Sequence, residues 1–194
     1  MALTATTRLE AVNTIIGVTG ETPINSLTGE LPLDAEVAQN ILDEVNRSIQ
    51  AKGWDFNTEA DLPLVPNQDG EIELSPTIVK IDVDSRRYYN INPKQRGTKL
   101  YDTKNRTFVF SSTLYAEAVY ILPFTDIPEA ARRYITIKAA RVFQKRFLGS
   151  DLIDSFTRDE EFEAWVDLRD AHLETGDYNI LQQSGSILSR RGRS

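Results

Sequence analysis

"QAKGWDFNTE", residues 50–59, marks a change in the spacing of the apolar residues. Lys52 and Gly53 are typical of the end of a helix, because glycine readily takes the left-handed conformation that follows the last turn. Trp54 and Phe56 then follow with the two-residue period of a strand. We expect both rings to bury on one face of a first strand, so that Trp54→Ala costs about 3–5 kcal/mol of the free energy of unfolding. The stretch is therefore the junction between a helical part and a β part.

Two helices are expected before this junction. The segment TTRLEAVNTIIGVTG, residues 6–20, has a threonine cap and apolar residues at helical spacing, with Gly17 or Gly20 as the stop. DAEVAQNILDEVNRSIQAKG, residues 34–53, begins at the cap Asp34 and carries an apolar stripe, which ends with Ile49. The prolines and the glycine between them predict a loop.

After the junction the apolar period shortens to about two residues, as in strands. Turn-forming clusters at 66–70, 92–97 and 102–106 separate the short runs. No stretch long enough for a crossover helix lies between the runs, so a parallel Rossmann-type sheet is disfavoured. The sequence predicts antiparallel strands at 54–57, 60–65, 71–74, 77–84, 86–91, 99–102, 107–110 and 116–122.

Helical spacing returns at Pro128 and continues to Gly149. A further helix is expected from about Asp151 to Leu173, with Phe156, Phe162, Trp165, Leu168 and His172 as its buried residues. Beyond Gly176 the chain reads as an extended arm, which is either a frayed terminus or a segment that folds onto another subunit.

The predicted fold class is α+β. Residues 1–53 and 126–175 form a discontinuous helical domain, and residues 54–125 form an inserted antiparallel β domain, a small sandwich or partial barrel. Residues 176–194 form the C-terminal arm.

Composition excludes several classes of chemistry. The chain has 194 residues, of which 40% are apolar and 26% charged, as in ordinary globular proteins. It has no cysteine, which excludes disulfides, a thiolate nucleophile and Cys-rich zinc sites, and His172 is its only histidine. No apolar run reaches the roughly 18–20 residues of a membrane span, and MALTATTRLEA lacks the apolar core of a signal peptide, so we expect synthesis in the cytosol.

Charge is divided unevenly along the chain, which has a net charge of -7. Residues 128–150 carry six bases against one acid, whereas residues 151–174 carry nine acids against two bases. The two expected helices either complement each other or meet the opposite face of a neighbouring copy in a ring. For the second case the residues expected to pair between subunits are Arg132, Arg133, Arg141, Lys145, Asp159, Glu160 and Glu163.

Catalysis, metal binding and nucleic-acid binding have weaker support. Glu160 and Glu163 belong to an acidic run of the kind found on solvated helix faces, although a glycan hydrolase also needs two carboxyl groups. No calcium loop, phosphate-binding loop or dinucleotide fingerprint is present, so neither a metal nor a cofactor is expected. Arg86, Arg87 and Tyr88 leave a small nucleic-acid-binding module as an alternative.

Four stretches carry a resemblance to a known family: AVNTIIGVTGETPINSL (11–27), ILDEVNRSIQAKGWDFN (41–57), IPEAARRYITIKAARVFQKRFLG (127–149) and DYNIL (177–181). The pattern from Asn46 to Asn57 is the most specific of them. In these stretches the chain resembles the tail tubular protein A family, the adaptor or gatekeeper proteins of the short tails of T7-like podoviruses.

The resemblance implies a structural role in the virion and no enzymatic activity. Such proteins form a closed ring of about twelve copies between the portal and the tail nozzle, a tail tubular protein B-like partner, and line the channel through which DNA leaves. Assembly would take place in the cytoplasm of the bacterial host.

The resemblance also implies roles for individual residues. The arm would bind the portal through Tyr178, Ile180, Leu181, Ile187, Leu188, Arg190, Arg191 and Arg193. The strand loops would face the nozzle through Asn67, Asp69, Gly70, Lys94, Arg96, Lys104 and Arg106.

Overall fold

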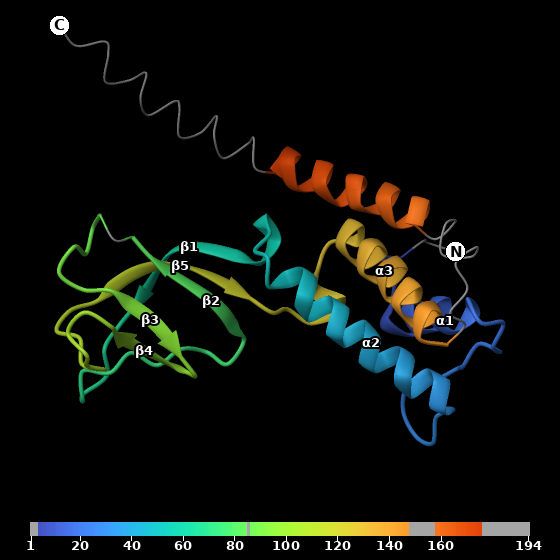
Figure 1. The fold of residues 1–194 in the computed structure, drawn as a ribbon, viewed down its shortest axis with the longest axis horizontal. Helices are drawn as coiled ribbons and strands as arrows, with labels where there is room; N and C mark the ends of the chain where they lie inside the picture. The colour runs from blue at the N-terminus through green and yellow to red at the C-terminus, as the bar shows by residue number, and fades with distance from the viewer. Residues whose placement is uncertain (1–3, 85, 148–157, 176–194) are drawn as a thin grey trace, which may run out of the picture. The chain divides into compact units, whose positions relative to one another are not determined.

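The computed structural model describes residues 4–84, 86–147 and 158–175 and has an α+β fold (Figure 1). Its contacts divide the chain into two compact units. The helical unit comprises Met1–Ser48 and Pro123–Ser194, and the β unit comprises Ile49–Leu122. Three helices are α1 (Arg8–Gly17), α2 (Leu33–Gln50) and α3 (Glu129–Phe147), and a further helix covers residues 158–175.

Local sequence explains where α1 begins. Thr7 and Glu10 form a capping box, in which the Thr7 amide donates to Glu10 Oε2 at 2.7 Å and the Glu10 amide donates to Thr7 Oγ1 at 3.2 Å. Arg8 then makes two hydrogen bonds of 2.7 Å to the carboxylate of Asp43, which connect α1 to α2. The buried residues of α1 are Ala11, Val12, Ile15 and Ile16.

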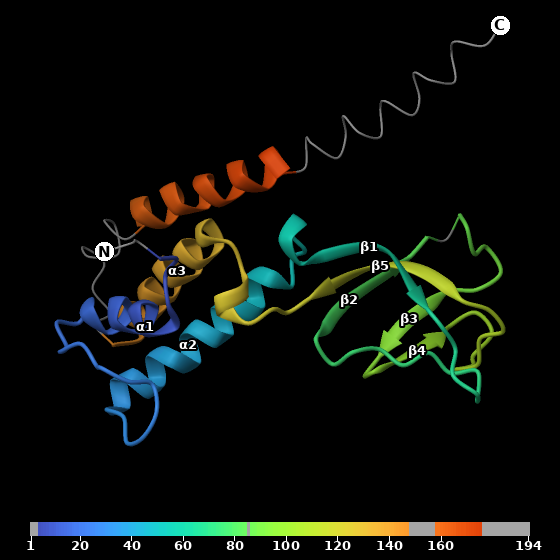
Figure 2. The same ribbon diagram turned by 180° about the vertical axis from the view of Figure 1, so that it is seen from behind.

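Helix α3 lies beside α1, as Figures 1 and 2 both show. The start of α3 is connected to the segment before α1, because the Thr6 amide donates to Glu129 Oε2 at 2.7 Å and Arg132 Nη1 donates to the Thr6 carbonyl at 2.9 Å. On another side of α3 the ring of Tyr134 packs against Trp165, with 5.3 Å between centroids. Helix α3 therefore contacts both α1 and the helix of residues 158–175.

The β unit has two antiparallel sheets around one core. Strands β1 (Thr58–Leu64), β5 (Leu114–Tyr120) and β2 (Ile78–Val83) form a sheet in that order, and β3 (Pro93–Arg96) pairs with β4 (Lys99–Asp102). The residues Glu71, Glu73, Thr107 and Val109 add isolated bridges. The core contains Leu64, Ile72, Leu74, Ile78, Val83, Leu100, Phe110, Leu114, Ala116 and Ala118.

The junction differs from the expected strand. Residues Asp55–Asn57 form a short 3-10 turn, because the Asn57 side-chain oxygen accepts from the Trp54 main-chain N–H at 2.8 Å and the Asn57 main-chain N–H donates to the Trp54 carbonyl. The rings of Trp54 and Phe56 therefore stack on each other, with 6.5 Å between centroids and 6° between planes, and do not alternate along a strand. Gly53 closes α2 with φ +83°, and a Cβ there would lie 3.2 Å from Val119.

Two buried amides hold this junction. Gln50 donates to the Leu122 carbonyl at 2.9 Å and accepts from the Leu122 amide at 2.8 Å, in the manner of a strand partner. Asn57 donates to the carbonyls of Gln50, at 2.9 Å, and Tyr120, at 2.6 Å. The polar groups of both side chains thus form hydrogen bonds with main-chain groups. These bonds join the first segment of the β unit, which begins at Ile49, to its last segment.

Other predicted strands are also corrected. Residues 86–91 form turns, because the Asp84 side chain accepts from the Arg86 amide and the Asp84 carbonyl from the Arg87 and Tyr88 amides. Residues 93–96, expected in a turn, form β3, with proline at the first strand position, where it is tolerated. Residues 71–74 and 107–110 contribute only isolated bridges, two from each segment.

The helix of residues 158–175 buries Ala164 and Leu168, whereas Phe162, expected in the core, is 66% exposed. Phe156 and the other residues of 148–157 lie outside the described residues.

Replacing the junction amide should destabilise the β unit. We expect Asn57→Ala to lower its free energy of unfolding by about 2–3 kcal/mol, because a buried amide and two carbonyls lose a partner. Trp54 lies in this unit and the only other tryptophan is Trp165, so in a Trp165→Phe background tryptophan fluorescence in urea reports the unfolding of the β unit. The exposed Asn90→Ala is the matched control, with a change below about 0.5 kcal/mol. Equal losses in both variants would contradict the role of Asn57.

Candidate interaction surfaces

The loop of residues 67–70 is held in one conformation by a single side chain. Asn67 Oδ1 accepts from the Asp69 amide at 3.0 Å and from the Glu71 amide at 2.9 Å. Gly70 has φ +78°, and a Cβ at this position would lie 2.7 Å from Val109 Cγ1, so only glycine fits. A rigid loop loses little conformational entropy when a partner binds, which suits this loop for docking.

The second predicted loop is a hairpin. Lys94 and Arg96 lie on β3, and Arg96 pairs in register with Lys99. The Arg96 guanidinium lies 3.6 Å above the Tyr101 ring, in a cation–π contact. This cation therefore has a partner in its own hairpin.

The third loop, residues 103–106, depends on a buried carboxylate. Asp102 is 1% exposed and accepts from the amides of Asn92 and Lys104, both at 2.9 Å, and from the Asn105 side chain at 2.6 Å. Burial alone would raise the pKa of Asp102, but these donors outweigh burial and hold the pKa below its ordinary value. A carboxylate held ionised in this way supports the loop and is poorly suited to act as a general base.

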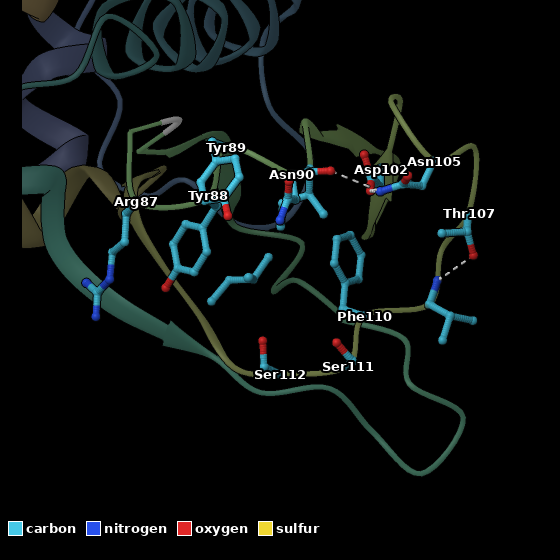
Figure 3. Close-up of a pocket in the computed structure, with 13 residues that line it drawn as sticks. Arg87, Tyr88, Tyr89, Asn90, Asp102, Asn105, Thr107, Phe110, Ser111 and Ser112 are labelled. Atoms are coloured by element: carbon cyan, nitrogen blue, oxygen red, sulfur yellow. Dashed lines mark hydrogen bonds between the residues drawn. The ribbon is translucent and has the colours of Figure 1, made fainter.

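A pocket of about 430 Å³ lies beside this loop. Figure 3 shows the rings of Tyr88 and Phe110 pointing into it, with the hydroxyl groups of Ser111 and Ser112 on one side. Tyr89 and Val109, which also line the pocket, are 76% and 57% exposed. Aromatic rings with hydroxyl and amide groups are typical of a surface that receives a protein side chain.

The bases Arg86 and Arg87, named for the nucleic-acid-binding alternative, lie among carboxylates. Arg87 lies 4.4 Å above the Tyr115 ring and 3.9 Å from Asp61, and Arg86 pairs with Asp84 at 3.3 Å. The depression that Arg86 and Arg87 line also contains the carboxylates of Asp61, Asp82, Asp84 and Glu117. These carboxylates would repel phosphate groups, so the arrangement disfavours the nucleic-acid-binding alternative.

The opposite charges of the last two described helices meet within the chain. Glu161 accepts from Arg141 at 2.7 Å and from Lys138 at 3.2 Å, and Arg133 pairs with Asp167. Arg132 donates to the carbonyls of Thr6, Thr125 and Ile127. Of the bases expected to pair between subunits, Arg133 and Arg141 thus pair with carboxylates of their own chain, and Arg132 binds its main chain.

The acids expected in the same role have a different environment. Asp159, Glu160 and Glu163 are exposed and available to a partner. A glycan hydrolase needs two carboxyl groups on either side of the bond that it cleaves, and these three exposed carboxylates on one helix do not have that arrangement. Within residues 4–84, 86–147 and 158–175, no three carboxylate or imidazole groups are placed to hold a metal ion.

The arm residues that were expected to bind the portal, from Tyr178 to Arg193, lie outside the described residues. The residues Gly53, Trp54 and Phe56 are structural, as described above.

Two features were missed from the sequence. One is the pair Gln50 and Asn57, whose only local signal is the position of two amides on either side of Gly53. The other is the exposed set Phe162, Val166 and Leu173, whose spacing of four and seven residues places them along one line of a helix.

The comparison with protein families covers both units. The model of the family described as tail tubular protein matches residues 9–178. The chain belongs to the tail tubular protein family. As a tail tubular protein it is a structural component of the bacteriophage tail and therefore of the virion. A comparison with the curated proteins finds no match.

In the parts of the chain that the structure describes, no helix is both long enough and apolar enough to cross a membrane.

The Glu161 contact should make stability depend on pH. Burial raises the pKa of Glu161, but the hydrogen bonds from Arg141 and Lys138 outweigh burial and leave the pKa below its ordinary value of 4.5. The ion pair therefore stabilises the fold fully above this value and is lost as pH falls through the lower, folded-state pKa. We expect the difference in unfolding free energy between wild type and Glu161→Gln to shrink between about pH 6 and pH 3.

Urea unfolding followed by far-UV circular dichroism at several pH values measures this difference. The neighbouring, exposed Glu160→Gln is the control, with a difference from wild type that stays small at each pH. A difference for Glu161→Gln that grew as pH fell would contradict the assignment.

Proposed function

We propose that the protein is the adaptor of a short podovirus tail, a homo-oligomeric ring between the portal and the tail nozzle that lines the DNA ejection channel. The observation that carries the proposal is the family match over residues 9–178, which runs through the helical unit, the β unit and the start of the arm. The motif around Gly53 and Trp54 supports the adaptor branch of that family.

The division into two units supports a protein with two kinds of partner. The helical unit has its own buried helix faces, and the β unit has its own core, so each unit can present a surface without disturbing the other. We assign the portal to the C-terminal arm and the nozzle to the loops of the β unit, of which the loop at 67–70 and the loop at 103–106 are the most rigidly supported. The pocket next to the loop at 103–106 would receive a side chain of the nozzle.

Net charge supports passage of DNA without retention. The chain carries 29 acids against 22 bases. Acidic residues on a channel wall repel phosphate groups, which lets the genome move without binding.

Removing the arm tests the portal contact. A chain that ends at Thr175 should keep both folded units but lose attachment to purified portal rings, because the arm carries the apolar anchors and the three arginines. A pull-down with portal rings measures attachment, and electron microscopy of the mixture shows whether a ring of the protein forms on the portal.

A chain of full length with Arg190, Arg191 and Arg193 changed to Gln separates the charge contribution from that of the apolar anchors. This variant should attach through the apolar anchors alone, so its attachment should depend less on salt concentration than that of the wild type. Normal attachment of the chain that ends at Thr175 would contradict the role of the arm.

A further inference from the structure

The helix of residues 158–175 has an apolar face that no described residue covers. Phe162, Val166 and Leu173 are 66%, 37% and 53% exposed. Their spacing places them along one line of the helix. Glu161 and Trp165 meet α3, and the buried Leu168 lies with them on a separate face of the helix. We call the line of Phe162, Val166 and Leu173 the exposed stripe.

The charges beside the exposed stripe are mostly negative. Asp159, Glu163 and Asp170 follow one flank, because each lies three or four residues from a member of the stripe. Arg169 lies on the other flank, and the whole helix carries seven acids against two bases. A segment that covers the stripe should therefore combine apolar residues with several bases.

The chain itself contains such a segment directly after this helix. Residues 176–194 begin at Gly176, which suits a reversal of the chain, and carry the apolar pairs Ile180–Leu181 and Ile187–Leu188. Arg190, Arg191 and Arg193 follow the second pair. The composition of the segment is thus complementary to the stripe in both apolar character and charge.

The dimensions also agree. Leu173 and Phe162 are separated by about 16 Å along a helix, at 1.5 Å per residue. The two apolar pairs are separated by at most about 23 Å in an extended chain, at 3.3 Å per residue. A segment that runs antiparallel to the helix places Ile180 and Leu181 near Leu173, Ile187 and Leu188 near Phe162, and the arginines near Asp159 and Glu163.

We propose that residues 176–194 fold back on the helix of residues 158–175 in their own chain and cover the exposed stripe. A second copy of the chain offers the same segment, but a segment attached to its site has an effective concentration in the millimolar range and competes successfully at ordinary protein concentrations. The fold-back does not depend on the function proposed above. One consequence does: an arm that binds the portal must first leave the helix, so the arm is withheld until a portal is present.

Disulfide formation tests the fold-back, because the chain has no cysteine of its own. The pair Glu163→Cys with Ser189→Cys joins residues that the antiparallel arrangement brings together. The pair Glu174→Cys with Ser189→Cys is the matched control, since Glu174 is exposed on the same helix at its other end. In an arm that does not dock, the control pair reacts faster because its loop is shorter. We expect the reverse order, with the Glu163 pair about tenfold faster and the product a monomer.

Each other outcome overturns the proposal. Equal rates, or a faster control pair, show that the arm does not lie along the helix. Disulfide-linked dimers from dilute protein, or from a mixture of the two single-cysteine chains, assign the stripe to a second copy. Attachment to portal rings is measured separately, so failure of the fold-back leaves the adaptor role standing.

A second set of variants tests the stripe itself. Phe162→Ser and Leu173→Ser should slow the Glu163 pair until it reacts no faster than the control pair in the same variant, without loss of helix content by circular dichroism. Leu33→Ser is the matched control, because Leu33 is 71% exposed on α2 and should leave the rate unchanged. An unchanged rate in Phe162→Ser would show that the apolar stripe does not hold the arm.

Discussion

The β unit depends on the buried amide side chains of Gln50 and Asn57. The chain enters this unit after α2 and leaves it after β5, and at both places a helix or strand ends with main-chain groups that need partners. The Gln50 side chain pairs with the main chain of Leu122 as a strand would. The Asn57 side chain donates to the main-chain carbonyls of Gln50 and Tyr120. These hydrogen bonds join the segment where the chain enters the β unit to the segment where it leaves. The β unit can therefore be one compact insertion in a helical unit that is discontinuous in sequence.

Charge organises the helical unit. The basic residues of α3 and the acidic residues of the helix 158–175 form two consecutive blocks in the sequence. Some of these bases and acids form ion pairs with each other within one chain. The exposed surface of the helix of residues 158–175 is both acidic and apolar. Such a surface is complementary to a partner with basic and apolar residues. An assembly protein benefits from this division, since internal pairs stabilise the subunit and the remainder is available for contacts.

Several predictions from the sequence rested on local signals and are confirmed by the structure. The α+β class, the threonine cap of α1 and the stop of α2 at Gly53 all depend on residues within a few positions of one another. The family resemblance, drawn from the stretches around Asn46–Asn57 and Pro128–Gly149, is confirmed by the family match over residues 9–178. The arm lies outside the described residues and remains a proposal.

Predictions failed where a contact outside the apolar pattern decided the local structure. Alternating aromatic residues at Trp54 and Phe56 indicated a strand, but the Asn57 side chain closes a turn there and binds Tyr120, far along the chain. Residues 93–96 carried the signals of a turn, yet pairing with β4 made them a strand. Phe162 was assigned to the core from its apolar character, whereas α3 occupies another face of its helix. The sequence by itself determined the positions of α1, α2 and α3, the threonine cap of α1, the charge blocks and the family, because these depend on neighbouring residues, whereas α2 begins at Leu33 and not at the expected cap Asp34. Only the tertiary structure decided which side chains are buried and which charges pair, because those depend on contacts between segments that the order of residues does not specify.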